Sequence, residues 1–207
     1  MSNPASKPYA LLEALSVFGM IQLYIWKLRF GRPYLWILIL MLVVSSHALR
    51  RETPAKLGFS RKNLSRSLTA LAPFVVLLSL ALLALGLVSR SIRHITPESG
   101  FWSLLLYCVW GLFQQYLLNG YFVNRFLEVA PARAPLLAAA FFSAAHLPNW
   151  FLMIVTLIGG YLSARVYLYS RNLYFLGLAH GVIGFLIYLV VPDTISHHLY
   201  VGPKWFS

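Results

Sequence analysis

Acidic residues are scarce in this sequence. Its 207 residues include five Asp and Glu against 17 Lys and Arg, so the formal net charge is +12 at pH 7. Charged residues of both signs make up 11% of the chain and hydrophobic residues 59%, which is outside the usual composition of soluble globular domains. The composition therefore indicates an integral membrane protein.

Cysteine is also nearly absent, because Cys108 stands alone. A single thiol excludes an internal disulfide and any metal cage built from cysteines. The excess of basic residues would suggest nucleic acid in a soluble protein, but here the aromatic residues do not interleave with them as a single-strand binding groove requires. Basic residues kept at membrane ends, with anionic lipid headgroups as partners, explain the charge without nucleic acid.

Long apolar segments dominate the chain and predict an all-α, polytopic membrane bundle of six to seven transmembrane helices. A helix needs about 20 apolar residues to cross the hydrocarbon layer, and the alternating ten-residue pattern of a β-barrel is missing. Whether the first two windows span fully is left open, because Glu13 interrupts the first and the second is short. The apolar windows are 9–26, 34–48, 69–89, 101–123, 135–148, 150–168 and 173–192.

The windows form one structural domain with three parts. Residues 1–100 hold the N-terminal helices and a basic loop, residues 101–192 a helical core, and residues 193–207 an interfacial tail. Placing the basic loop in the cytoplasm puts eleven Lys and Arg on that side and six on the other. This distribution predicts a multi-pass protein of a bacterial inner (cytoplasmic) membrane, with a retained first segment.

Five polar residues lie inside apolar helices and need an explanation. Polar side chains are costly in lipid, so they normally face the bundle interior and often mark a site. From the helical rise, Gln114 lies about 16 Å from Arg125, and His146 lies about 16 Å from Pro135. The same arithmetic predicts that polar groups of three helices meet at one depth, although hydrogen bonding between helices is the simpler role for each alone. The five are Gln114, Gln115, Asn119, His146 and His180.

Small residues and an aromatic ring surround this polar set. Gly160 and Ala164, like Gly159 and Ser163, have the small-xxx-small spacing that lets helix backbones approach closely. Phe142 precedes His146 by four residues and therefore shares its helix face, where the ring can hold the imidazole in place.

The order and separation of three motifs resemble the CPBP family of intramembrane proteases, also called the CAAX-prenyl endopeptidase and bacteriocin-processing or Abi family. These motifs are "QQYLLNG" at 114–120, "FSAAH" at 142–146 and the histidine in "LAHGVIG", and the resemblance covers roughly residues 101–192. The family pattern is Glu-Glu-x-x-x-Arg, then Phe-x-x-x-His, then His-x-x-x-Asn or Asp.

This resemblance implies a bundle of membrane helices around a cavity in which a glutamate activates water and histidines support attack on a peptide bond. By position, Gln114 replaces the catalytic glutamate, Gln115 the second glutamate and Asn119 the arginine. The resemblance assigns Phe142, His146 and His180 to the retained positions, whereas Gly184 stands at the last Asn or Asp position.

A carboxamide cannot take a proton from water, so Gln114 cannot act as the family glutamate does. The Gln115 and Asn119 pair can replace an ion pair with a neutral hydrogen bond. The sequence therefore favours a catalytically silent homologue that serves as a subunit or assembly factor of a membrane complex. Whether the chain is an enzyme stays open at this point.

Two alternatives remain. An active intramembrane endopeptidase would use His146 or His180 as its base on a membrane-associated peptide or protein. A haem or chlorophyll-type pigment would use one of them as an axial ligand. We expect neither a resident metal nor a cofactor, because two histidines without an acid or thiol nearby make a poor metal site. His197 and His198 in the tail are adjacent, so they do not share a helix face, and contact with headgroups is the favoured role.

Overall fold

The computed structural model describes residues 6–207, and all regular elements within them are helical. An all-α membrane bundle was predicted, and it is confirmed. The longer helices are α1 (Ser6–Leu23), α2 (Trp36–Leu49), α3 (Leu64–Val88), α4 (Pro97–Gln115), α6 (Ala134–Ala144), α7 (Trp150–Ser170) and α8 (Leu173–Val190). Shorter elements are the π-helical turns η1 (Tyr24–Leu28) and η3 (Tyr116–Val123), and the helices α5 (Asn124–Val129) and α9 (Asp193–Ser196).

Among residues 6–207, five helices are long and apolar enough to cross a membrane. They are Lys7–Leu28, Leu64–Val88, Pro97–Val129, Trp150–Ser170 and Leu173–Val190. The window that Glu13 interrupts thus lies in a helix of full length, whereas the second window corresponds to the shorter apolar helix Pro33–Leu49. Helix α6 has 11 residues and rises only about 16 Å, so the window 135–148 overestimated it.

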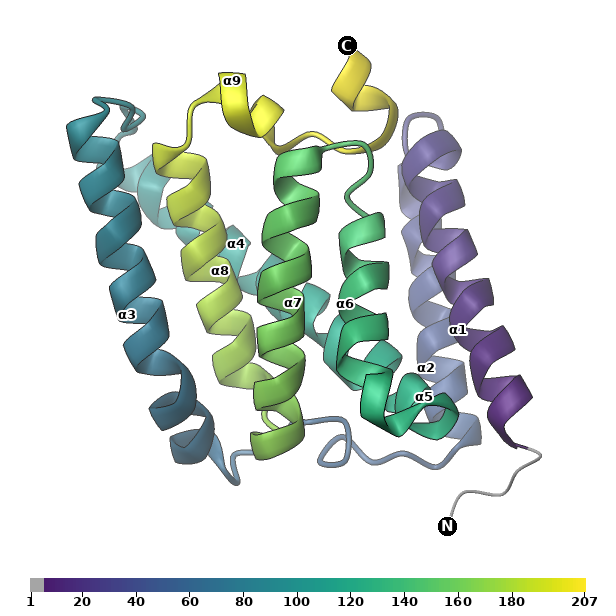
Figure 1. The fold of residues 1–207 in the computed structure, drawn as a ribbon. Coiled ribbons are helices and arrows are strands. Elements are labelled where there is room, and N and C mark those ends of the chain that lie inside the picture. Colours follow the sequence, from purple (N-terminus) through teal and green to yellow (C-terminus); the bar gives the residue numbers. More distant parts are fainter. Residues whose placement is uncertain (1–5) are drawn as a thin grey trace.

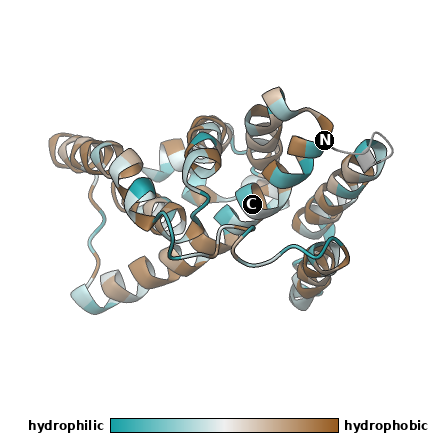
Figure 2. Ribbon diagram, turned by 90° about the horizontal axis from the view of Figure 1, so that it is seen from below, coloured by the Kyte–Doolittle hydropathy of each residue, from teal (hydrophilic) through white to brown (hydrophobic). Residues whose placement is uncertain are grey.

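Helices α1 and α2 run antiparallel, and α7 is antiparallel to both α6 and α8, whereas the neighbours α3 and α8 run in the same direction (Figure 1). The α1–α2 hairpin lies at one edge and α3 at the other, with α6, α7 and α8 between them and α4 running obliquely behind. The N-terminal end, the basic loop 50–63 and α5 share one end of the bundle, which we call the loop end. The chain's last segment crosses the opposite end, which we call the tail end. Apolar residues dominate the outer helices when the bundle is seen along its axis (Figure 2).

Helices α4 and α8 pack with their backbones almost in contact. A Cβ atom added to Gly181 would lie 2.5 Å from Cys108 Cα, and one added to Gly111 would lie 2.7 Å from the Gly177 carbonyl oxygen. The small-xxx-small spacing in the sequence had instead predicted close helix packing at α7. There Gly160 does face Ala139 of α6, but a Cβ on Gly159 would meet nothing within 4 Å. The spacing of Gly177 and Gly181 was the stronger signal in the same sequence.

Candidate functional site

The polar site begins where α4 changes its winding. Gln115 is the last residue of α4, and the π-helical turn η3 follows directly and contains Asn119. In a π-helical turn the backbone hydrogen bonds run from residue i to i+5, and such turns often occur at functional sites. The turn lies inside the long membrane helix Pro97–Val129, so it widens the helix at the level of the polar residues.

A chain of amides connects this helix to its neighbours. Asn119 Nδ2 donates to Gln115 Oε1 at 2.6 Å, and Gln115 Nε2 donates to His180 Nδ1 of α8 at 3.1 Å. Asn119 Nδ2 also lies 3.4 Å from Ser163 Oγ of α7. Both amide side chains are buried. The glycine contact between α4 and α8 makes the bond to His180 possible, because bulkier residues there would separate the two helices.

The hydrogen-bond partners determine the tautomers of the two histidines. An amide nitrogen only donates, so His180 Nδ1 is an acceptor and its proton is on Nε2. His146 Nδ1 lies 2.7 Å from the Phe142 carbonyl oxygen, which only accepts, so here the proton is on Nδ1. The two neutral imidazoles thus differ at Nε2, which is a donor in His180 and a lone-pair acceptor in His146.

The Phe142 ring connects the two histidines. Its centroid lies 5.0 Å from that of His146 and 5.9 Å from that of His180, with both pairs packed edge to face. The ring therefore packs on His146 as predicted, and it restricts the His180 ring as well.

Comparison with known proteins found a family match over the helices that carry this site. Residues 96–186, from the start of α4 to near the end of α8, match the family model described as type II CAAX prenyl endopeptidase Rce1-like. This segment is therefore similar to the CPBP family over residues 96–186. No curated protein and no solved structure gave a match. The matched segment contains every motif position on which the resemblance was based, from Gln114 to His180.

Gln114, at the position of the family glutamate, stands apart from the amide chain. Its side chain is half-buried, and the hydrogen bonds among residues 6–207 do not include one from its amide. It is Gln115 that reaches His180. The structure thus joins Gln115, Asn119 and the Phe142 ring with both histidines, and it leaves Gln114 outside these contacts. The functional role of all six positions stays a prediction.

The described residues hold no group of three or more His, Cys, Asp or Glu side chains that could bind a metal ion. The acidic residues lie at other places in this protein. Asp193 forms an ion pair with Arg93, and Glu98 lies exposed in the first turn of α4. The other three carboxylates meet at the loop end, in a cluster that the sequence analysis did not foresee.

This ionic cluster is organised around Arg125 of α5, whose side chain is completely buried. Arg125 Nη2 lies 2.8 Å from Glu52 Oε2, and Arg125 Nε lies 3.1 Å from Glu13 Oε1 of α1. Arg50 connects the remaining acid, with its Nη1 2.7 Å from Glu128 Oε1 and its Nη2 2.6 Å from Glu13 Oε2. The cluster explains how Glu13 is accommodated in a membrane helix, since two guanidinium groups neutralise it at the helix end.

The Glu52 carboxylate makes this cluster sensitive to acid. Burial raises the pKa of Glu52, but hydrogen bonds and charge from His47 and Arg125 outweigh it and lower the pKa from 4.5 to about 2. A lowered pKa stabilises the folded state above the unfolded-state pKa, and this stabilisation is lost as the pH falls through the folded-state value. We expect the unfolding free energies of wild type and Glu52→Gln to converge between about pH 4.5 and about pH 2. Unfolding titrations in detergent at several pH values measure this, and a constant difference would contradict it.

Proposed function

We propose that this CPBP-like protein is catalytically silent and acts by binding other membrane proteins, as a subunit or assembly factor of a larger complex. The observation that carries this proposal is the Asn119–Gln115–His180 chain. Gln115, at the position of the family's second glutamate, donates to His180, and Asn119, at the position of the arginine, donates to Gln115. A general base must exchange a proton near the working pH, and a carboxamide does not.

The positions of the carboxylates support the same proposal. Glu13, Glu52 and Glu128 are held by guanidinium groups at the loop end, and Asp193 is paired at the tail end. Replacing the family's buried charges with hydrogen-bonded amides keeps a packed polar core without an uncompensated charge. A helical core that has lost its base but keeps its shape is suited to holding partners.

One observation favours a second candidate, an active intramembrane endopeptidase. His146 Nε2 keeps a lone pair that no donor among residues 6–207 occupies, and His180 presents an N–H beside the same phenylalanine ring. A neutral imidazole can take a proton from water. In this candidate His146 is the base and His180 the donor.

The basic loop end supports an orientation with that end in the cytoplasm of a bacterial inner membrane. Anionic lipids are then the expected headgroup partners of this end, and the composition gives no reason to expect nucleic acid.

Parallel purification of tagged variants from the native host in mild detergent tests the proposal. The set is wild type, His146→Ala and, as a matched control, His94→Ala, which removes an exposed histidine outside the site. For a silent subunit, mass spectrometry finds the same membrane proteins at the same stoichiometry with all three. A protein that purifies alone contradicts the proposal. A partner retained only by His146→Ala is a trapped substrate and establishes the second candidate.

A further inference from the structure

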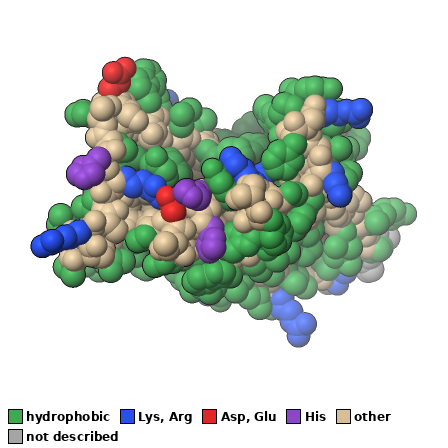
Figure 3. Space-filling view, turned by 90° about the horizontal axis from the view of Figure 1, so that it is seen from above, with side chains coloured by type: hydrophobic (Ala, Val, Ile, Leu, Met, Phe, Trp, Pro, Cys, Tyr) green, Lys and Arg blue, Asp and Glu red, His purple; other side chains and the backbone are tan. Residues whose placement is uncertain are grey.

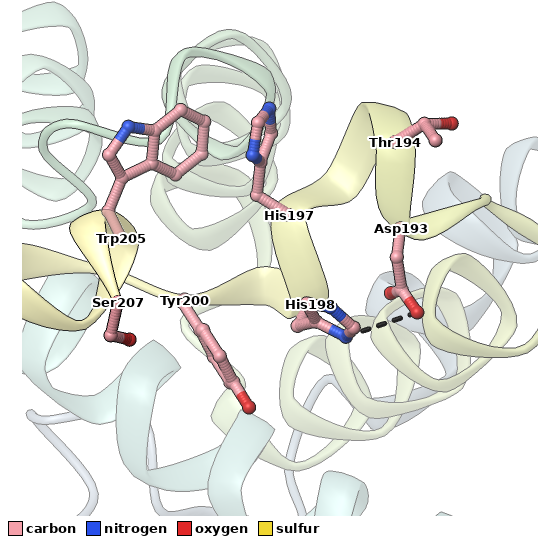
Figure 4. Close-up of a pocket in the computed structure, with 7 residues that line it drawn as sticks. All are labelled: Asp193, Thr194, His197, His198, Tyr200, Trp205 and Ser207. Atoms are coloured by element: carbon pink, nitrogen blue, oxygen red, sulfur yellow. Dashed lines mark ion pairs between the residues drawn. The ribbon is translucent and has the colours of Figure 1, made fainter.

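A pocket opens at the tail end of the bundle, far from the amide chain. It has a cavity volume of about 360 Å³. All the residues that line it belong to the last segment of the chain (Figure 4), and Figure 3 shows this end of the molecule in a space-filling view. The lining residues are Asp193, Thr194, His197, His198, Tyr200, Trp205 and Ser207. Neither the motif residues nor the proposed function uses this pocket.

The segment that forms the pocket is held firmly against the bundle. Asn149, buried at the start of α7, donates through Nδ2 to the carbonyl oxygens of Ser196 at 2.9 Å and Tyr200 at 3.0 Å. Arg29 Nη2 donates to the Val201 carbonyl at 2.7 Å. The Gly202 amide donates to the Leu147 carbonyl at 2.7 Å. The walls of the pocket are thus fixed in place without a ligand.

Backbone strain places the two histidines. His197, His198 and Leu199 follow one another with φ angles of 48°, 54° and 57°, in the left-handed region that residues with a side chain seldom adopt. Backbone strain of this kind tends to occur at binding sites. The turn directs His198 toward Asp193 and leaves His197 packed against Trp205, with ring centroids 3.8 Å apart and ring planes tilted by 37°.

The free polar groups of the pocket are hydroxyls and an imidazole, each of which can donate a hydrogen bond as well as accept one. Its carboxylate, Asp193, is already engaged by both terminal nitrogens of Arg93 and by His198 Nδ1 at 3.1 Å. Lys204 adds a positive charge at the rim, because its Nζ lies 4.0 Å from the centre of the Tyr200 ring. The imidazole of His197 and the hydroxyls of Thr194 and Tyr200 have no partner among the hydrogen bonds of residues 6–207.

We propose that this pocket binds a phosphate group. Free donors, one uncompensated lysine and a neutralised carboxylate complement a phosphate better than a cation. The pocket lies at the end of the membrane helices, and its tryptophan and tyrosine are of the kind that sit at headgroup level. The phosphate can therefore belong to a lipid headgroup or come from solution.

Thermal unfolding of the full chain in detergent tests the site. The probes are a short-chain phosphatidic acid, the matching phosphatidylcholine and inorganic phosphate. A ligand that binds the folded state raises the melting temperature with increasing concentration. We expect His197→Ala and Lys204→Ala each to weaken phosphatidic acid binding by about tenfold. Arg32→Ala, which removes a charge at the same end outside the pocket, leaves the affinity unchanged within about twofold.

The probes also separate the two sources. Stabilisation by phosphatidic acid, with none by inorganic phosphate, supports a headgroup site. Equal stabilisation by both supports a site for free phosphate. If neither raises the melting temperature of wild type, or if Arg32→Ala weakens binding as much as Lys204→Ala, the proposal is wrong, because the response is then absent or due to general surface charge.

Discussion

Arg125→Met should lower the free energy of unfolding by about 3–5 kcal/mol, because it leaves the buried Glu52 carboxylate without its guanidinium partner and removes one of the two guanidinium groups at Glu13. The Arg125 side chain is completely buried and lies within 3.1 Å of Glu13 and 2.8 Å of Glu52. Methionine has a volume similar to that of arginine, so the loss of unfolding free energy measures mainly the missing charge and less the change in packing. Equilibrium unfolding in mixed detergent micelles measures the change.

Two further variants make this prediction specific. Lys56→Met removes a cation from the same loop, but Lys56 is 66% exposed and 3.9 Å from Glu52, so the expected cost is below about 1 kcal/mol. Adding Glu52→Gln to Arg125→Met removes one orphaned charge and should recover part of the loss. If Arg125→Met costs no more than Lys56→Met, the cluster does not hold the loop end together.

The polar site and the ionic cluster differ in charge, because the first is neutral and the second is built from ion pairs. At the level of the motif residues, hydrogen bonds join Gln115, Asn119 and His180 without a formal charge. At the loop end, the carboxylates of α1 and α5 meet two arginines. Charges at a membrane boundary are less costly than charges at its centre. This arrangement stabilises the fold and leaves a core that is polar without being acidic.

Hydropathy predicted the helical architecture because unpaired backbone N–H and C=O groups are very costly in lipid. An apolar segment that crosses the membrane therefore forms its backbone hydrogen bonds within a helix. The sequence spacing also predicted the packing of Phe142 on His146, which the structure shows, whereas the contact of the same ring with His180 was not predicted. Helix length was less predictable. Glu13 argued against a full first span, yet its partners Arg50 and Arg125 lie 37 and 112 residues away. A local pattern does not contain such long-range pairs.

The pairing of Gln115 rather than Gln114 with His180 was not predictable either. Straight α-helical geometry turns successive residues by a fixed angle, whereas η3 is wound as a π-helix from Tyr116 to Val123. We attribute this change of winding to tertiary packing, because no residue type in the segment predicts a π-helix. The closeness of α4 and α8 determines which amide reaches the histidine.

Replacing Gly181 with alanine tests whether the close packing of α4 and α8 lets Gln115 reach His180. This variant should be destabilised by about 3 kcal/mol. The added Cβ would lie 2.5 Å from Cys108 Cα and 2.7 Å from Cys108 N, both backbone atoms of α4 that cannot rotate away. The helices must therefore separate, and separation also breaks the 3.1 Å bond from Gln115 to His180. Unfolding titrations in micelles give the stability change.

Gly159→Ala is the matched control, because a Cβ there meets nothing within 4 Å. Alanine is the better helix former by up to about 1 kcal/mol, so this variant should be neutral or slightly stabilised. The two substitutions are chemically identical and lie in neighbouring membrane helices. Equal stability of both variants would mean that α4 and α8 can move apart freely, and close glycine packing would then not be what holds Gln115 against His180.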